Sequence, residues 1–283
     1  MVADVSATAR AGHGYTLRVN LVTSEAPPVT GLALQVKDLR VSYGAKRAVD
    51  GLSLEINEGE IFGLLGPNGA GKTSTLSAIE GLLTPTSGSI LIREVDVRAH
   101  PGLAKALMGV QLQSTSFQSE LKISEIVKLF AGLYGVPLTK PAILDRLTEI
   151  HLGDEASRRF SELSGGQQKR LALLIATVHE PPLVLLDEPT SGLDPQARRQ
   201  LWDRIEGVRK SGRSILLTTH SMEEAQSVCD RVAIMDNGKI LTVDTPAGLI
   251  EKHKNDPNVL AVARGQVTLE DVFIGLTGRE LRE

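Results

Sequence analysis

The sequence predicts an α/β fold, in which strands and helices alternate along the chain. A glycine-rich segment, residues 66–74, lies between an apolar run that predicts a strand and a pattern that predicts a helix. Two short apolar runs, residues 183–186 and 214–219, are typical of buried parallel strands. An alternating run at residues 32–41 predicts the first strand of the main domain.

Composition limits the classes of protein that fit. The 283 residues are 41% hydrophobic and 23% charged, which is ordinary globular composition. The formal net charge of −3 gives no electrostatic reason to expect a nucleic-acid partner. No apolar run approaches the ~18 residues of a membrane span, and the N-terminus lacks the apolar core of a signal peptide. The single cysteine, Cys229, excludes an internal disulfide and is interpreted as a buried helix residue in a reducing cytoplasm.

The elements follow in order along the chain. Residues 1–31 show no sustained hydrophobic period and predict a flexible leader. Strands are predicted at 32–41, 52–56 and 61–66, and a helix after the glycine-rich segment has Leu76, Ile79 and Leu83 on one face. The region from about 114 to 161 is expected to be helical, with a stop at residues 135–137. Near the end, Asn237 and Gly238 predict a tight hairpin turn.

The glycine-rich segment has the pattern of a phosphate-binding loop. It fits G-x-x-x-x-G-K-[ST] and has the strand–loop–helix setting that such a loop requires. Backbone N–H groups would surround the phosphates, Lys72 would reach the β and γ oxygens, and the Thr73 hydroxyl would ligate Mg²⁺. The predicted binding residues are Gly66, Pro67, Asn68, Gly69, Ala70, Gly71, Lys72, Thr73 and Ser74.

Polar residues follow the two buried strands. Because ligands gather at the carboxyl ends of strands in α/β sheets, Asp187, Glu188 and His220 should converge on the phosphate loop. Asp187 is expected to hold the magnesium shell and Glu188 to polarise an attacking water. His220 could reach the γ-phosphate, whereas the other five histidines are interpreted as structural.

A second possible phosphate element, LSGGQ at residues 163–167, opens an apolar helical pattern some ninety residues later. Together with Tyr43, the phosphate loop, Gln113, residues 183–188, residues 191–194 and His220, it resembles the nucleotide-binding subunit of an ABC transporter. The resemblance covers about residues 33–283. It implies a P-loop NTPase core with a mixed sheet, an N-terminal antiparallel β subdomain and an inserted helical subdomain that carries the signature.

The resemblance also assigns roles and boundaries. Tyr43 would stack on adenine, Gln113 would sense magnesium and water and couple to a membrane partner, and Asp194 would act across a dimer. Gln111 is a nearby alternative, but Gln113 has the usual offset from Gly109. Residues 32–283 would form the ATPase domain, with a helical subdomain at about 114–162 and a C-terminal extension at about 240–283.

In the family, the signature serves the ATP of the opposite subunit. The resemblance therefore implies a head-to-tail homodimer with two composite sites, to which Ser164, Gly165, Gly166 and Gln167 contribute. Glu188 and His220 are both present, so both sites should be active.

Two segments, the tail at residues 267–283 and FAGLYGVP at residues 130–137, resemble the ATPase subunits of type-2 ABC exporters, including those that confer drug and antibiotic resistance. An amphipathic helix that simply covers the core explains the same residues. The expected protein is a cytoplasmic ATPase, peripheral on the inner face of the membrane, that uses ATP and Mg²⁺ to power a separate permease. Alternatives are an importer ATPase and a soluble ABC-type ATPase acting on DNA or the ribosome. A kinase or GTPase would leave the signature and His220 unexplained.

Overall fold

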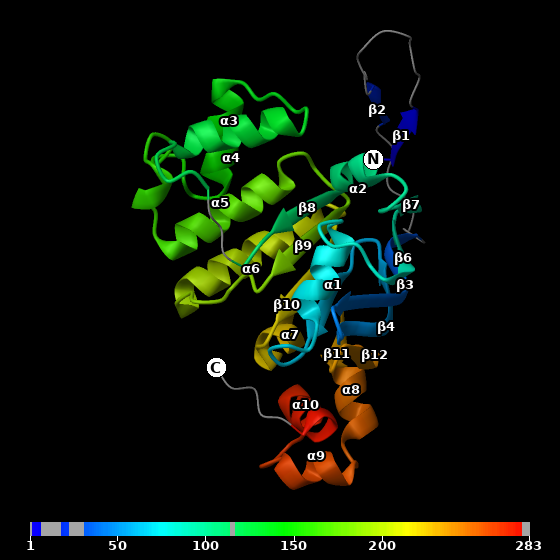
Figure 1. Cartoon of the computed structure of the whole chain (residues 1–283). Coiled ribbons are helices and arrows are strands. Elements are labelled where there is room, and N and C mark those ends of the chain that lie inside the picture. Colours follow the sequence, from blue (N-terminus) through cyan, green and yellow to red (C-terminus); the bar gives the residue numbers. More distant parts are fainter. Residues whose placement is uncertain (1, 7–17, 23–30, 114–116, 279–283) are drawn as a thin grey trace. The chain divides into compact units, whose positions relative to one another are not determined.

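The computed structural model describes residues 2–6, 18–22, 31–113 and 117–278 (Figure 1). The chain divides into two compact units, Met1–Gly31 and Leu32–Glu283. Within the described residues, the first unit holds one two-stranded sheet, and the second holds a six-stranded sheet, a four-stranded sheet and the helices.

In the first unit, β1 (Val2–Ser6) pairs antiparallel with β2 (Arg18–Val22). The register places Val2 opposite Val22 and Val5 opposite Val19. The sequence analysis names no strand within residues 1–31, because it finds no sustained hydrophobic period there, whereas the structure has these two strands of five residues each. The flexibility of the leader stays a prediction.

The second unit is built around a six-stranded mixed sheet (Figure 1). Neighbouring strands are parallel except for the edge pair β11–β12, which is antiparallel. The strands predicted at 61–66, 183–186 and 214–219 are therefore confirmed. In spatial order the strands are β12 (Lys239–Asp244), β11 (Arg231–Asp236), β5 (Ile61–Leu65), β10 (Ser214–Thr219), β9 (Leu183–Asp187) and β8 (Met108–Gln111).

Alternate residues of the central strands enter two separate hydrophobic cores. Phe62 and Leu64 of β5 belong to the core that includes α1 (Lys72–Ile79). Ile61 and Leu65 belong to the core that includes α6 (Pro195–Lys210) and α7 (Met222–Val228). Because both faces are covered, β5, β9 and β10 are buried along their whole length, which explains their continuous apolar runs.

A four-stranded antiparallel sheet shares the core that contains α1. Its strands confirm the predictions at 32–41 and 52–56, although the first strand continues to Tyr43. In spatial order they are β4 (Lys46–Asn57), β3 (Leu32–Tyr43), β6 (Ser87–Ile92) and β7 (Val95–Asp96). The short helix α2 (Pro101–Ala106) connects this sheet to β8.

Helix α1 is shorter than its sequence pattern predicts. Leu76 and Ile79 lie on the buried face as expected, but Leu83 lies beyond the last helical residue. Gly81 has a φ of +70°, a left-handed conformation that ends a helix. The placement of Leu83 on this helix is therefore wrong, although its side chain still packs against the same core.

The helices between β8 and β9 form a subdomain with its own core. They are α3 (Ile123–Leu133), α4 (Lys140–Glu149), a 3-10 turn η1 (Phe160–Glu162) and α5 (Gly165–Thr177). Helix α3 ends just before Gly135, whose φ is +74°, so the predicted stop is confirmed. The expectation of a helical region over 114–161 is too broad, because loops separate these helices and residues 114–116 lie outside the described part.

The C-terminal part begins with the predicted hairpin. Asn237 and Gly238 connect β11 to β12 with φ values of +47° and +79°, as a tight two-residue turn requires. Helices α8 (Pro246–His253), α9 (Pro257–Val262) and α10 (Leu269–Thr277) follow, and α10 buries Leu269, Val272 and Phe273 in the core of α6 and α7. Residues 279–283 of the tail lie outside the described part.

Cys229 is buried but is not inside a helix. It follows the last residue of α7 as its C-cap. A Cβ added to Gly63 of β5 would lie 2.8 Å from the Cys229 sulfur, so this thiol packs directly against the central sheet. Among the described helices, none combines the length and the apolar character that a bilayer crossing requires.

Candidate active site

The phosphate loop connects β5 to α1, and two of its glycines, Gly66 and Gly71, are tightly enclosed, whereas Asn68 and Gly69 at its tip are exposed. Gly71 has a φ of +110°, and a Cβ there would lie 2.3 Å from the Ala48 carbonyl oxygen of β4. A Cβ on Gly66 would lie 2.4 Å from the Met235 carbonyl oxygen of β11. Only glycine fits these two positions, because the loop packs between strands of two different sheets.

Lys72 is the first residue of α1, and its ammonium group points back into the loop. Its Nζ donates hydrogen bonds to the carbonyl oxygens of Gly66 at 2.7 Å and Pro67 at 3.2 Å. An ammonium group has three N–H donors, and the described contacts use two of them. The third can bind a phosphate oxygen. Burial lowers the pKa of Lys72, and the nearby charges of Glu188 and Asp187 oppose this shift. Thr73 is exposed and Ser74 half-buried at the same helix N-terminus, where anions bind favourably.

Asp187 and Glu188 differ in their surroundings. Asp187, the last residue of β9, is buried, and its Oδ1 accepts a hydrogen bond from the Thr218 hydroxyl at 2.5 Å. The Glu188 backbone N–H donates to the same hydroxyl oxygen at 3.0 Å. Glu188 has a φ of +44°, a strained conformation for a residue with a side chain. Such strain is common at functional sites, and here Thr218 helps to hold it in place.

The structure brings together the three predicted catalytic side chains. The Gln113 side-chain N–H group donates to Glu188 Oε2 at 2.9 Å, and His220 Nδ1 lies 3.5 Å from Glu188 Oε1. These residues follow β8, β9 and β10, so three neighbouring parallel strands deliver them to one end of the sheet. Gln111, the alternative, is buried at the end of β8, and its amide has no hydrogen-bond partner among the described residues.

Lys169 of α5 is a site residue that the sequence analysis did not identify. Its Nζ donates to the Gln113 carbonyl oxygen at 2.6 Å, which connects the signature helix to the segment that holds Gln113. Burial lowers the pKa of Lys169, and the charges of Asp187 and Glu188 oppose the shift. The sequence analysis does not identify Thr218 either, although a hydroxyl side chain within a buried apolar run indicates a polar contact at that position.

The signature residues open α5 in an exposed setting. Ser164 is the N-cap: its hydroxyl accepts from the Gln167 backbone N–H at 3.3 Å, and the Gln167 side chain accepts from the Ser164 N–H at 2.9 Å. Gly165 has open space where a Cβ would be, whereas a Cβ on Gly166 would lie 3.0 Å from the Ala197 Cβ of α6. Within the described residues, no hydrogen bond or ion pair joins this segment to the phosphate loop.

Tyr43 and Asp194 lie outside the cluster around Glu188. Tyr43 is the last residue of β3 and is 54% exposed. It pairs with Lys46, the first residue of β4, which lies two residues before the Ala48 that contacts the phosphate loop. Asp194 is exposed and is the N-cap of α6, accepting from the backbone N–H groups of Gln196 and Ala197 at 2.9 Å each.

The predicted metal ligands supply the right kind of atoms for Mg²⁺. Thr73 offers a hydroxyl oxygen, Gln113 an amide oxygen and Asp187 a carboxylate oxygen, and Mg²⁺ prefers oxygen ligands while keeping several waters. Asp187 and Gln113 both lie at the end of the sheet that carries the phosphate loop. The donor set therefore fits the metal.

The mixed sheet carries a glycine loop with a lysine at the carboxyl ends of its parallel strands, and Glu188 follows one of these strands. This arrangement is typical of nucleotide-hydrolysing proteins. The family model described as ABC transporter matches residues 49–191. The chain belongs to the ABC transporter family, and its main unit is that family's ATP-binding ATPase domain.

Curated relatives and solved structures agree with this assignment. A protein of Ralstonia nicotianae named Nod factor export ATP-binding protein I is 37% identical and aligns with 92% of this chain and 99% of the relative. A protein of the same name from Paraburkholderia xenovorans is 39% identical over 77% of this chain and 72% of the relative. A solved ATP-binding subunit of an ABC transporter superposes with a TM-score of 0.76 at 28% identity, covering 86% of this chain and 99% of that structure.

Proposed function

We propose that two copies of this chain pair head to tail around two ATP molecules, hydrolyse them, and power export of a substrate through a separate integral-membrane permease. The observation that carries the proposal is the Glu188 carboxylate, which contacts both the Gln113 amide and the His220 imidazole. A carboxylate in this setting can accept a proton from an attacking water.

Each group has a step in the reaction. The loop N–H groups and Lys72 bind the β- and γ-phosphates, and Gln113 and His220 orient the Glu188 carboxylate. As the water oxygen attacks the γ-phosphorus, Glu188 takes its proton and the bond to the β–γ bridging oxygen breaks, so that ADP leaves. Mg²⁺, when held by Thr73, Asp187 and Gln113, supplies positive charge that neutralises the phosphate oxygens.

The exposed signature supports the pairing of two copies. Ser164 and Gly165 are exposed at the N-terminus of α5, where the Ser164 cap uses the Gln167 N–H, so the backbone N–H groups of Gly165 and Gly166 are the ones that an anion would meet. In a head-to-tail pair, Ser164, Gly165, Gly166 and Gln167 of one copy would serve the ATP that is held by the phosphate loop of the other. Tyr43 would stack on adenine, and Asp194 would face the partner.

Mixed dimers test this shared site. In the first, wild-type chain is paired with a chain carrying both Lys72→Ala and Ser164→Arg, so that a composite arrangement leaves neither site whole. In the second, the two changes are on separate chains, so that both defects fall in one site and the other stays intact. We expect the second dimer to hydrolyse ATP at least as fast as the first. The reverse order contradicts shared sites. If both dimers are silent, ATP-driven dimerisation of the two mixtures is compared instead.

The direction of transport rests on the relatives, whose names describe export ATP-binding proteins. A permease partner would hold the chain at the inner face of the cell membrane. Co-purification of the chain with a membrane protein of about six spans tests this part, and co-purification with ribosomes or DNA instead would contradict it. The drug and antibiotic class of substrate stays a prediction from the tail and from residues 130–137.

A further inference from the structure

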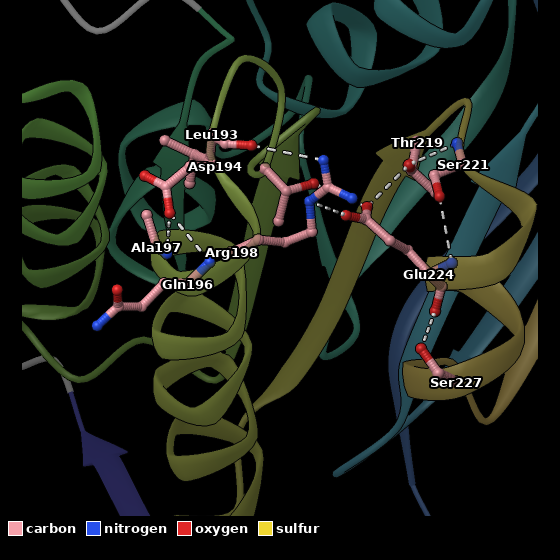
Figure 2. Close-up of polar contacts among 10 residues, drawn as sticks. Leu193, Asp194, Gln196, Ala197, Arg198, Thr219, Ser221, Glu224 and Ser227 are labelled. Carbon is pink, nitrogen blue, oxygen red and sulfur yellow. Dashed lines mark hydrogen bonds and ion pairs between the residues drawn. The ribbon is translucent and has the colours of Figure 1, made fainter.

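Glu224, in the first turn of α7, makes an unusual use of its side chain. The pattern Ser221-x-x-Glu224 is that of a capping box, in which the glutamate would accept from the Ser221 N–H. Only half of the box forms: the Glu224 N–H donates to the Ser221 hydroxyl at 3.2 Å, but the Ser221 N–H donates to the Thr219 hydroxyl at 3.0 Å (Figure 2). The Glu224 carboxylate is therefore available for other partners.

Those partners come from three separate segments of the chain. The Thr190 hydroxyl donates to Glu224 Oε2 at 2.7 Å, and the Thr219 hydroxyl lies 3.4 Å from the same oxygen. Arg198 of α6 forms an ion pair with the other oxygen, Nε to Oε1, at 3.2 Å (Figure 2). Glu224 is only 7% exposed, and a buried carboxylate requires such partners.

Each partner of Glu224 lies close in sequence to a predicted site residue. Thr190 comes two residues after Glu188, and Thr219 comes one residue before His220. Arg198 lies four residues after Asp194, and its Nη2 also donates to the carbonyl oxygen of Leu193 at 3.5 Å (Figure 2). One buried carboxylate thus connects the segments that carry the predicted water-activating glutamate, the γ-phosphate histidine and the aspartate that would face the partner.

We propose that Glu224 is a positioning residue, which holds the segments of Glu188, His220 and Asp194 in the arrangement that hydrolysis requires. This inference rests on the proposed ATPase function. Glu224 does not touch the reacting groups, so its loss should slow the chemical step while leaving the phosphate loop able to bind ATP.

The test compares Glu224→Gln with Glu223→Gln in the full-length chain. Both changes remove one negative charge from the first turn of α7, but Glu223 is exposed. For Glu224→Gln we expect kcat to fall about 10- to 100-fold, as for a lost hydrogen bond to a buried charged group. The KM for ATP and the midpoint of thermal unfolding should stay close to those of Glu223→Gln. An unchanged kcat in a folded Glu224→Gln variant overturns the inference.

A second pair of variants decides the matter if Glu224→Gln does not fold. Thr190→Val replaces the donating hydroxyl by a methyl group of similar size, and Thr190→Ser keeps a hydroxyl. We expect Thr190→Val to lower kcat and Thr190→Ser to restore it, whereas equal rates in both variants contradict the inference. A wild-type chain that hydrolyses no ATP would contradict the proposed function itself, which separates that failure from this one.

Discussion

The phosphate loop and the signature loop both contain glycines and both begin a helix, but their surroundings differ. Gly66 and Gly71 face backbone carbonyl oxygens of β11 and β4 so closely that no side chain fits. Ser164 and Gly165 are exposed, and nothing lies within 4 Å of a Cβ on Gly165. Two glycines of the first loop are enclosed by their own chain, whereas the start of the second loop is exposed.

Two glycine-containing helix starts, which could both bind an anion, are thus suited to different roles. In the proposed pair, the phosphate loop holds ATP with groups of its own chain, such as Lys72 and Glu188, and the signature of the other copy completes the site. An exposed loop is suited to a ligand that arrives on another molecule. Changes at the two loops should therefore have different consequences.

The largest effect is expected from Glu188→Gln, which removes the proposed proton acceptor beside the phosphate loop. Hydrolysis should slow by about 10²- to 10⁴-fold, the usual cost of losing a general base. ATP binding should persist, because Lys72 and the loop are untouched. Steady-state turnover and equilibrium ATP titration measure the two quantities. Turnover within tenfold of wild type would show that Glu188 is not the base.

The same substitution in both loops tests the comparison directly. Gly71→Ala places a Cβ against the Ala48 carbonyl oxygen at a φ of +110°, so we expect it to lower the free energy of unfolding by about 2–4 kcal/mol. Gly165→Ala enters open space at a helix start and should change stability by less than about 1 kcal/mol, in the stabilising direction. Urea titration of both variants measures this, and equal losses would refute the contrast.

Lys72→Ala should weaken ATP binding by about 10- to 100-fold, since a charged donor to the phosphates is lost. Lys37→Ala, which removes an exposed lysine from β3, is the control and should leave affinity unchanged. Equilibrium titration with ATP gives both dissociation constants. Affinity of the Lys72 variant within twofold of the control would exclude this role.

The smallest effect on hydrolysis is expected from Glu80→Gln at the far end of α1. Burial, with a contribution from Asp187, raises the pKa of Glu80 to about 7. The folded chain thus keeps a proton that the unfolded chain loses near pH 4.5, so the wild type loses stability as pH rises from about 4.5 to 7. At pH 8 the glutamine variant should be more stable by about 1–3 kcal/mol, and the gain should vanish near pH 4.5. Thermal unfolding across this range, with Glu223→Gln as control, measures it; a constant difference at all pH values would contradict the shifted pKa.

Local patterns predicted most of the fold and part of the site. Continuous apolar runs identified β9 and β10, and the polar residues directly after them meet around Glu188 because parallel strands end at one edge. The end of α1 was missed because apolar spacing continues to Leu83 while the backbone turns at Gly81. Contacts between elements that are distant in sequence produce no periodic pattern, so the sequence does not predict them in this way.

Glu224 and Lys169 illustrate that limit. The pattern Ser221-x-x-Glu224 is typical of a capping box, whereas the Glu224 carboxylate contacts Thr190 and Arg198, which come from other elements. Lys169 lies two residues after the signature, yet its ammonium group reaches a carbonyl oxygen 56 residues away in sequence. Which partner a long side chain chooses depends on the packing of α5, α6 and α7 rather than on neighbours in the chain.

The burial of Cys229 has a practical consequence. Only the thiolate form attacks maleimides and disulfides, and burial against Gly63 raises the pKa of this thiol and excludes reagents. The folded chain should therefore behave as if it had no reactive cysteine. A spin label or fluorophore attached to a cysteine introduced at the exposed Lys37 of β3, outside the proposed sites, would report from that position alone, so distances between two copies could be followed through the ATP cycle.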